Sequence, residues 1–183
     1  MKIFVKQLYD DKGVKIPVVL PQKGSPLSAG YDMVATSEPK IVGVKGDVIP
    51  ISDGGEIQSW RSIDYIEYET NLFIAPSSLS FHTLIHPRSS VSKYNLVLAN
   101  SIGLVDNDYR GMILCRFKYV WQPTDFFQHK TALVGSINME KIYKKGDKIA
   151  QLVGETTLTL DCELVDDIAL TQRGDGRFGS SGK

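Results

Sequence analysis

Residues His86 to Gly111 read HPRSSVSKYNLVLANSIGLVDNDYRG and carry the densest pattern in the sequence. The apolar run Leu96–Ala99 predicts a short buried strand. The turn-forming residues Asn100–Gly103 follow it, and Asn and Gly both tolerate positive φ. We therefore expect a strand and a tight turn at the centre of this stretch, with polar groups before and after them.

The polar groups on either side indicate an anion site and a base. Ser89 can cap a one-turn helix over Ser90–Tyr94, whose free backbone N–H groups, together with Arg88, would face a phosphate. Asp106 lies in an acidic turn and can hold a water as general base, because a carboxylate needs only hydrogen-bond reach to do so. A surface turn with a solvated acidic tip fits the same residues, so these residues alone leave the function open.

Short apolar or alternating runs, separated by Gly, Pro, Asp and Ser, make up most of the chain. Cys115, Phe117, Tyr119 and Trp121, for example, fall on one face of a strand. Such runs, with frequent turn signals and little helical periodicity, predict an all-β sandwich or barrel. The expected strands are Lys2–Leu8, Ile41–Ile49, Leu79–Ile85, Met112–Trp121, Lys148–Val153 and Thr156–Val165, and QPTDFFQHK is expected to form a loop.

The composition is that of one ordinary domain. The chain has 183 residues, enough for a sizeable core, and its formal net charge is zero. A neutral chain offers no broad basic field for nucleic acid, so an anionic ligand must be held by a local cluster of cations. No apolar stretch reaches the ~20 residues that span a bilayer, and no signal-peptide pattern begins the chain, so we expect no membrane contact and a cytoplasmic location. Cys115 and Cys162 have no metal-like spacing and are expected to be reduced, mostly buried thiols.

Five segments resemble, in order, the five motifs of the trimeric dUTP pyrophosphatases (dUTPases), and together they cover most of the chain. SAGYDMVAT at Ser28–Thr36 resembles motif one, and PRSS at Pro87–Ser90 resembles motif two. ANSIGLVDNDYRG at Ala99–Gly111 resembles motif three, and GDKIAQL at Gly146–Leu152 resembles motif four. RGDGRFGSSG, which begins at Arg173, resembles motif five.

The fold of this family is a jelly-roll-like β-barrel, which agrees with the strand pattern. The resemblance implies such a barrel over residues 1–172, with at most one short helix. It implies a mobile Gly-rich arm over residues 173–183, which closes over a neighbouring subunit's site. A homotrimer with shared active sites is implied as well.

The resemblance also implies the reaction, which is hydrolysis of dUTP to dUMP and pyrophosphate. This activity keeps uracil out of DNA and supplies dUMP for thymidylate synthesis. Mg²⁺, bound mainly by the three phosphates, is the implied cofactor, and Asp32 would reach it through water.

Individual roles follow from the same resemblance. Asp106 would hold the water that attacks the α-phosphorus, and Tyr109 would lie under the deoxyribose and leave no space for a 2′-hydroxyl. The segment Asn100–Val105 would be a β-hairpin turn that takes the uracil, whose edge an amide can read as both donor and acceptor. The implied substrate-binding residues are Arg88, Ser89, Ser90, Asn100, Gly103, Val105, Tyr109, Gln151, Arg173, Phe178, Gly179, Ser180 and Ser181.

The chain departs from the family pattern in three places. The family more often has Gly where Ser90 and Arg177 stand, and Arg177 either adds a phosphate contact or stiffens the arm. The segment from Arg88 to Asn100 is one residue shorter than in the commonest members. Ser52–Thr70 has no counterpart in the pattern, so an insertion at about 52–69 is expected to form a surface loop or an extra hairpin. Its aromatic residues make it a candidate surface for a protein partner.

Two alternative functions fit parts of the sequence. A dCTP deaminase has a related fold in which RSS is common at motif two, but its catalytic glutamate lies near where Arg116 stands here. A non-catalytic dUTPase-like module would sense a nucleotide and bind a protein through the 52–69 insertion. Because Asp106, Tyr109, Arg173 and Phe178 are all in place, the sequence favours the enzyme.

Overall fold

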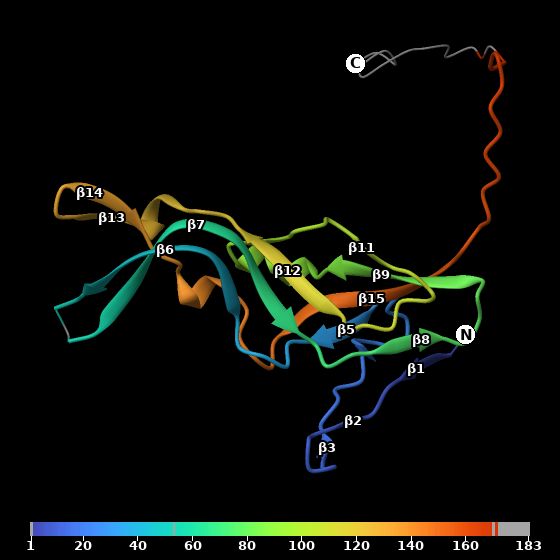
Figure 1. Ribbon diagram of the computed structural model, residues 1–183, viewed down its shortest axis with the longest axis horizontal. Helices are drawn as coiled ribbons and strands as arrows, with labels where there is room; N and C mark the ends of the chain where they lie inside the picture. Colours follow the sequence, from blue (N-terminus) through green and yellow to red (C-terminus); the bar gives the residue numbers. More distant parts are fainter. Residues whose placement is uncertain (1, 53, 170, 172–183) are drawn as a thin grey trace.

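The computed structural model describes residues 2–52, 54–169 and 171 of the chain (Figure 1). Strands and the turns and loops between them make up most of these residues. The strands are β1 (Ile3–Val5), β2 (Leu8–Tyr9), β3 (Lys15–Ile16), β4 (Gln22–Lys23), β5 (Tyr31–Val34), β6 (Lys40–Pro50), β7 (Glu56–Glu69), β8 (Ile74–Pro76), β9 (Phe81–Pro87), β10 (Leu96–Leu98), β11 (Gly103–Val105), β12 (Leu114–Tyr119), β13 (Phe126–His129), β14 (Ala132–Gly135) and β15 (Lys148–Thr156). The helices of the described residues are single 3-10 turns, η1 (Ser89–Lys93), η2 (Pro123–Asp125) and η3 (Met139–Lys141).

Two large sheets build the body of the molecule. One has the strand order β11-β9-β15-β5-β4, and the other has the order β10-β12-β7-β14-β13 with β6 added on β7. β1 pairs with β8 and β2 pairs with β3 in two smaller sheets, and the pairings throughout are antiparallel. The predicted all-β, jelly-roll-like barrel is confirmed, although the described residues form three short 3-10 helices where at most one short helix was expected. No helix in the described part of the chain is long and apolar enough to cross a membrane.

The core takes side chains from both large sheets, because alternate residues of each strand face inward. On β12, Cys115, Phe117 and Tyr119 are buried, as the alternating pattern predicted. On β15, Ile149 and Leu152 are buried as well. Each fully buried apolar side chain of this size contributes roughly 1.5–3 kcal/mol, so the two sheets are held together mainly by this cluster.

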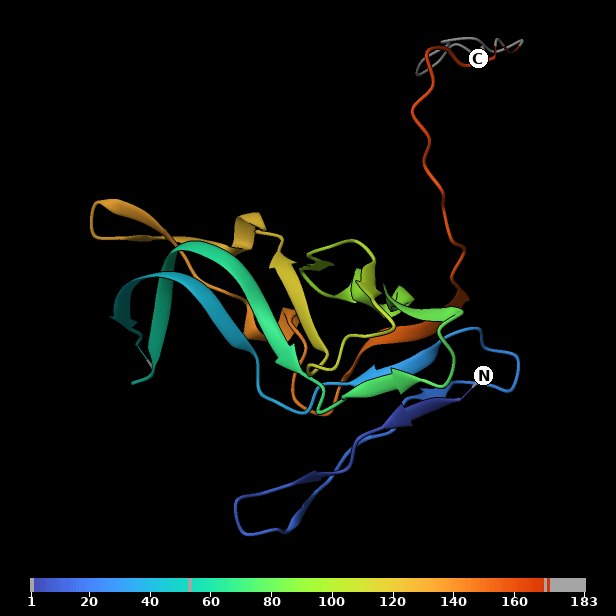
Figure 2. The same cartoon turned by 45° about the vertical axis from the view of Figure 1, so that its right-hand side comes forward.

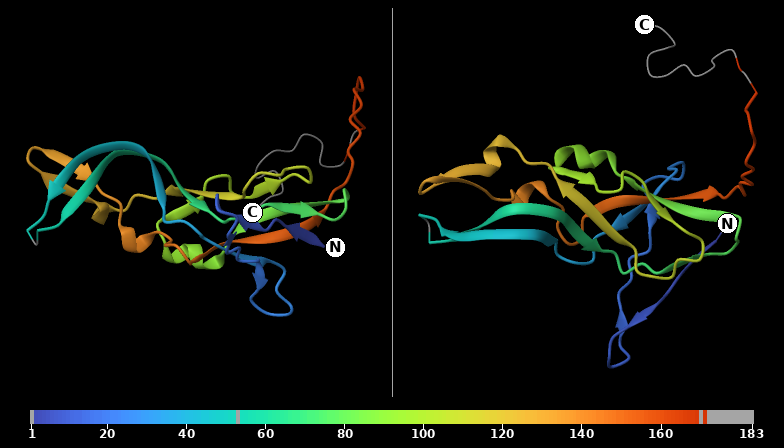
Figure 3. Two further views of the ribbon diagram at one scale, coloured as in Figure 1. Left: turned by 60° about the horizontal axis from the view of Figure 1, so that its bottom comes forward. Right: turned by 45° about the horizontal axis from the view of Figure 1, so that its top comes forward.

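β6 and β7 form a long curved ribbon that extends beyond the barrel (Figures 1 and 2). The β13–β14 hairpin lies at the same end of the molecule, and its Gly135 pairs with Trp60 of β7 (Figure 3). The loop predicted for QPTDFFQHK is therefore wrong, because this segment forms η2 and β13. The signal was present in Phe126 and Phe127, two strand-forming aromatics that follow the turn residues Pro123 and Asp125.

The ribbon also corrects the predicted insertion. A surface loop over the whole of Ser52–Thr70 is wrong, because Ile66 and Tyr68 are fully buried and their strand pairs with β12. The extra-hairpin alternative describes only the part near the tip, where β7 pairs with β6 beyond the barrel. Charged residues between the apolar ones made this core strand look like a surface segment.

The chain after β15 leaves the body and runs away from it (Figure 1). The strand predicted for Thr156–Val165 is wrong beyond Thr156, since residues 157–169 have no strand partner. Leu158, Leu160 and Leu164 alternate as in a strand, yet they are 77%, 83% and 99% exposed. The pattern of a strand is thus present, but the segment pairs with no strand in the described part of the chain. Cys162 is exposed, contrary to the expectation of a buried thiol.

Candidate active site

Three segments that are far apart in the sequence meet at the carboxylate of Asp32 on β5. Arg88, just after β9, donates from Nε to Asp32 Oδ1 at 2.9 Å. Gln151 on β15 donates from Nε2 to the same oxygen at 3.2 Å. Lys148 Nζ lies 2.9 Å from Asp32 Oδ2. The residues predicted from motifs one, two and four are therefore in one cluster, which also contains Lys148.

The charge of this cluster is set by the burial of Asp32, which is only 5% exposed. Burial alone raises the pKa of a carboxyl group, but the hydrogen bonds from Lys148 and Gln151 and the charge of Arg88 act against it and hold the pKa of Asp32 below its usual range. Asp32 is therefore ionised near neutral pH. Two cations and one carboxylate leave the cluster with a net positive charge, which suits an anionic ligand in a neutral chain.

Gly30 in motif one allows Gln151 to reach Asp32. A Cβ atom at position 30 would lie 3.0 Å from Gln151 Cβ and 3.3 Å from Gln151 Oε1, which is closer than side chains normally approach. Glycine therefore leaves space for the Gln151 side chain against the β5–β15 pair. The close approach of Gln151 to the backbone of motif one therefore requires glycine at position 30.

The one-turn helix after Arg88 is present but begins one residue earlier than predicted. Arg88 is the N-cap residue of η1, and no side chain caps the turn, so the predicted cap by Ser89 is wrong. Ser89 is exposed, and its carbonyl accepts a hydrogen bond from Ser92 Oγ at 2.9 Å. Arg88 Nη1 donates to Ser90 Oγ at 3.2 Å and to the Lys148 carbonyl at 3.3 Å, so the guanidinium joins η1 to β15.

The turn after β10 connects the two large sheets. β10 pairs with β12 and β11 pairs with β9, so the two strands do not pair with each other, and the expected hairpin is wrong. Ser101 has the positive φ of 59°, a conformation that was expected of Asn100 or Gly103. Gly103 is buried, and a Cβ at this position would lie 3.1 Å from Asn100 Nδ2 and 3.2 Å from Ile85 Cβ, so a larger residue would crowd both neighbours.

A pocket of about 360 Å³ opens beside this turn. The turn predicted to take uracil, the predicted general base Asp106, and Tyr109 all line this pocket. Strand residues from the other side complete the wall. The pocket is lined by Ile85, Asn100, Gly103, Leu104, Val105, Asp106, Tyr109, Met112, Ile113, Leu114 and Arg116.

Hydrogen bonds hold the acidic turn in place. Asn107 Nδ2 donates to the carbonyls of Ser78 and Phe81 at 2.7 and 2.6 Å. The Tyr109 hydroxyl donates to the Met112 carbonyl at 3.1 Å, which fixes the ring at the pocket edge. The Asp106 carboxylate is exposed and accepts no hydrogen bond from the described residues, so it is free to hold a water.

Arg116 and Glu67 were not predicted from the sequence. Arg116 lines the pocket, and its Nε and Nη2 each lie 2.8 Å from Glu67 Oε2. Lys40 Nζ lies 3.2 Å from the other Glu67 oxygen. Burial alone would raise the pKa of Glu67. The hydrogen bonds from Arg116 and Lys40 together outweigh that effect and hold the pKa of Glu67 below its usual range. The only signal in the sequence was strand alternation, which places Glu67 on the face of β7 opposite to the buried Ile66 and Tyr68.

The Asp32 cluster and the pocket beside Asp106 are two separate places in the described part of one chain. No residue of the Asp32 cluster lines that pocket. The described residues also hold no group of His, Cys, Asp and Glu that could bind a metal by itself. The remaining predicted site residues, Arg173, Phe178, Gly179, Ser180 and Ser181, lie outside the described residues.

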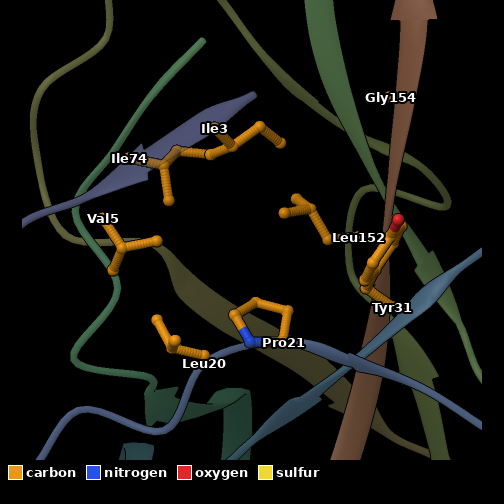
Figure 4. A pocket seen from close by; sticks show the side chains of 8 residues that line it. All are labelled: Ile3, Val5, Leu20, Pro21, Tyr31, Ile74, Leu152 and Gly154. Carbon is orange, nitrogen blue, oxygen red and sulfur yellow. The ribbon is translucent and has the colours of Figure 1, made fainter. Parts of the chain in front are cut away.

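A second pocket, apolar and about 270 Å³ in volume, shares no lining residue with either place (Figure 4). β1 and β8 contribute one wall, and Leu152 and Tyr31 contribute another. Its lining offers no ionised side chain that could bind a phosphate. The lining residues are Ile3, Val5, Leu20, Pro21, Tyr31, Ile74, Leu152 and Gly154.

Comparisons of this chain with a family model and with individual proteins all agree on one family. The dUTPase family model matches residues 132–182. A deoxyuridine 5′-triphosphate nucleotidohydrolase from Pasteurella multocida is 31% identical over 184 residues, covering 100% of this chain and 98% of the relative. A protein of the same name from Arabidopsis thaliana is 32% identical over 164 residues, covering 90% of this chain and 76% of the relative.

Solved structures share the fold. A dUTPase of Staphylococcus bacteriophage 80alpha, described with dUpNHpp, has a TM-score of 0.63 and 22% identity, covering 100% of this chain and 99% of the other. A dUTPase of phage phi11 of S. aureus, described with a structural Mg(II) ion, has a TM-score of 0.56 and 20% identity, covering 91% and 98%. At these identities the likeness concerns the fold.

Proposed function

The chain belongs to the dUTPase family and is a dUTP diphosphatase, and we propose that a water held by Asp106 attacks the α-phosphorus of dUTP in line. The pocket that places Asp106 beside Asn100 and Tyr109 carries this proposal. A carboxylate with free acceptor capacity can accept the water's proton as the P–O bond forms. The products are dUMP and pyrophosphate.

Uracil and deoxyribose occupy the same pocket in this account. The base enters at the turn from Asn100 to Val105, where the Asn100 amide offers both donor and acceptor groups. The Tyr109 ring lies under the sugar and rejects a 2′-hydroxyl by contact. The fixed position of that ring, through its bond to the Met112 carbonyl, supports this role.

The Asp32 cluster binds the triphosphate. Arg88 presents a planar fork of donors, which suits phosphate oxygens, and Gln151 adds an amide donor. Ser89 and Ser90 contribute hydroxyl groups from the beginning of η1. The net positive charge of the cluster offsets the charge of the triphosphate as the pyrophosphate leaves.

Mg²⁺ is the proposed cofactor, and the donor set of Asp32 fits an indirect contact. Asp32 Oδ1 already accepts two hydrogen bonds and Oδ2 accepts one, so one acceptor position is left for a water of the ion. Mg²⁺ keeps several waters and binds largely through substrate phosphates, so no dense cluster of carboxylates is needed. When bound, the ion supplies positive charge at the phosphates.

A homotrimer with shared sites is proposed because the Asp32 cluster and the Asp106 pocket are separate in one chain. A site that needs both must combine two copies, and the arm over residues 173–183 would come from a third. The exposed leucines of residues 157–169 and the apolar pocket of Figure 4 support contacts between copies, since water-exposed apolar surface of both kinds favours burial. A monomer should therefore be nearly inactive.

The deaminase alternative is less well supported. The described acidic residue nearest Arg116 is Glu67, which is buried, ion-paired to Lys40 and Arg116, and depressed in pKa. A carboxylate in that state cannot hold a proton to donate near neutral pH. Glu67 therefore cannot serve as the acid for amine departure at this place.

A second function, protein binding through the ribbon of β6 and β7, stays a candidate because the ribbon projects from the barrel (Figure 2). One solved relative is described as a phage dUTPase that controls transfer of virulence genes. Shortening the ribbon tip between Val48 and Gln58 should leave dUTP turnover intact. Loss of turnover in that variant would argue against a separate role.

The proposed reaction is tested by pyrophosphate release in the presence of Mg²⁺ with dUTP, UTP, dCTP and dTTP. We expect turnover of dUTP in large excess over the other three. Sedimentation of the same preparation should give a trimer. Equal turnover of dUTP and UTP would contradict the role given to Tyr109, and release of ammonia from dCTP would favour the deaminase.

A further inference from the structure

A buried tyrosine beside η1 has a hydroxyl group without a hydrogen-bond partner among the described residues. Tyr143 is 1% exposed, and its Oη has no hydrogen bond to the described residues. Such a hydroxyl has lost its hydrogen bonds to water without forming one to the protein, which costs free energy, and native proteins rarely contain such a group. Tyr143 lies between η3 and β15, in a part of the chain to which no motif assigns a role.

Packing fixes the Tyr143 ring. Its centroid lies 4.3 Å from that of Tyr94, the residue that ends η1, and 5.4 Å from that of Phe117 in the core. Tyr68 contacts the ring edge-on and donates its hydroxyl to the Tyr143 carbonyl at 2.9 Å. These contacts hold the ring in one orientation, beside the residue that ends η1.

Ser90 and Arg88 are the polar groups beside this hydroxyl. Burial raises the pKa of Tyr143 to about 12, and the Ser90 hydroxyl and the charge of Arg88 both act against that increase. The Ser90 oxygen is thus near Tyr143 Oη, yet the two do not meet in hydrogen-bond geometry. Ser90 is half-buried on η1, so its side chain can turn between staggered rotamers.

The hydrogen-bonding capacity of Ser90 shows what this change of rotamer would do. A serine hydroxyl has one donor and two acceptor positions. Arg88 Nη1 already donates to Ser90 Oγ at 3.2 Å. If Tyr143 fills the second acceptor position, the Ser90 proton must point to a third group. In the proposed complex that group is a phosphate oxygen of the substrate, which Arg88 would contact as well.

We propose that Tyr143 is a positioning residue that donates its hydroxyl to Ser90 Oγ and so directs the Ser90 proton to a phosphate oxygen of bound dUTP. This inference rests on the proposed function, since Ser90 acts on the triphosphate. It gives a physical reason for serine at a position where glycine would leave the Tyr143 hydroxyl unpaired in every state. Tyr143 itself does not touch the substrate.

The first test compares steady-state kinetics of Tyr143→Phe in the wild-type and Ser90→Ala backgrounds. Tyr143→Phe keeps the ring and removes only the hydroxyl. We expect the KM for dUTP to increase about three- to tenfold with kcat nearly unchanged, the size and kind of effect that follow from losing one neutral hydrogen bond to bound substrate. In the Ser90→Ala background the same change should have no further effect.

Tyr68→Phe is the matched control. It removes a hydroxyl from the same aromatic cluster, but that hydroxyl bonds the Tyr143 carbonyl and not η1. We expect Tyr68→Phe to lower the melting temperature and leave KM unchanged. Tyr143→Phe should instead keep or raise the melting temperature, because it removes an unpaired buried group.

The inference would be overturned by an unchanged KM in Tyr143→Phe, or by an equal increase in KM in both backgrounds. A crystal structure of the wild type with Mg²⁺ and dUpNHpp gives a test that depends on neither folding of the variant nor turnover. There we expect Tyr143 Oη and Ser90 Oγ within about 3.0 Å, and a distance beyond about 3.5 Å would contradict the inference. Failure of the proposed function is distinct, since it would appear as a wild type that does not hydrolyse dUTP.

Discussion

Arg88 donates from Nε to Asp32 Oδ1 at 2.9 Å, which joins residues 56 positions apart. The same guanidinium donates from Nη1 to η1 and to β15, so its plane is fixed by three partners. The N–H groups of Nη2 are left for an anion. An arginine that is already ordered loses less conformational entropy when it binds a ligand, so Asp32 would preorganise Arg88 for the proposed contact with a phosphate.

Replacing Arg88 by lysine tests this arrangement. One ammonium cannot donate to Asp32, Ser90 and a phosphate in the geometry of the fork, although the charge is kept. Steady-state kinetics of Arg88→Lys should give a loss of about tenfold or more in kcat/KM, the size expected from a charge-assisted hydrogen bond. Arg61→Lys, an exposed change on β7, is the control and should behave as wild type. Wild-type kinetics in Arg88→Lys would show that the fork is not used.

Gly30→Ala should weaken substrate binding without unfolding the protein. The added Cβ would displace the Gln151 side chain, which lies 3.0 Å from the site of that atom, and would break the bond from Gln151 to Asp32. We expect a higher KM for dUTP. Gly24→Ala is the matched control, because its Cβ would meet only Ser28 Oγ at 3.7 Å. The prediction fails if both variants have the same KM.

Tyr109→Ala should admit ribonucleotides. The ring is held at the pocket edge by its hydroxyl, so Tyr109→Phe keeps the ring while loosening it, and Tyr109→Ala removes it. The ratio of kcat/KM for UTP to that for dUTP should rise sharply in Tyr109→Ala and only slightly in Tyr109→Phe. An unchanged ratio in Tyr109→Ala would assign sugar discrimination to another residue.

Glu67→Gln should lower stability at neutral pH and remove part of the acid sensitivity. Because the pKa of Glu67 is lower in the folded state than its ordinary 4.5, its stabilisation is fully present above that pH and is lost as the pH falls through the folded-state value. Glu67 is buried but its partners are half-exposed or more, so we expect a loss of about 1–2 kcal/mol in the free energy of unfolding at pH 7. Urea unfolding at several pH values measures this.

The difference between Glu67→Gln and wild type should become smaller below pH 4.5 and vanish once Glu67 is protonated in the folded wild type. A constant difference from pH 7 to pH 3 would mean that the charge of Glu67 is not what stabilises β7 against β12. Glu69→Gln is a suitable control, because Glu69 is exposed on the same strand.

The sequence predicted the all-β fold and brought Asp32, Arg88 and Gln151 together through motif resemblance. Strand alternation was a reliable guide where both faces of a strand differ, as at Cys115 and Phe117 on β12. It failed after β15, since the alternation of Leu158 and Leu160 indicates a strand but says nothing about whether a partner edge exists. Pairing is a property of the whole chain, or of several chains, and not of the segment.

The misjudged parts of the site have local physical causes. The sequence suggested a serine cap at Ser89, but backbone geometry begins η1 one residue earlier and leaves the cap position to Arg88. Glu67 was not recognised because a buried charge is visible only when its partners on β6 and β12 are placed beside it. Tyr143 had no signal at all, since a single tyrosine before a turn is common and its unpaired hydroxyl exists only in three dimensions.

The most direct test of the central claim is pyrophosphate release from dUTP with Mg²⁺ by wild type and by Asp106→Asn, with trimer formation checked for both. Asparagine keeps the size of the side chain but cannot accept the proton of the attacking water. Asp11→Asn, an exposed change near the β2–β3 turn, controls for the loss of one charge. We predict rapid turnover by wild type and Asp11→Asn and a loss of about a hundredfold or more in kcat for Asp106→Asn. Turnover by Asp106→Asn at the wild-type rate would contradict the assignment of Asp106 as the base.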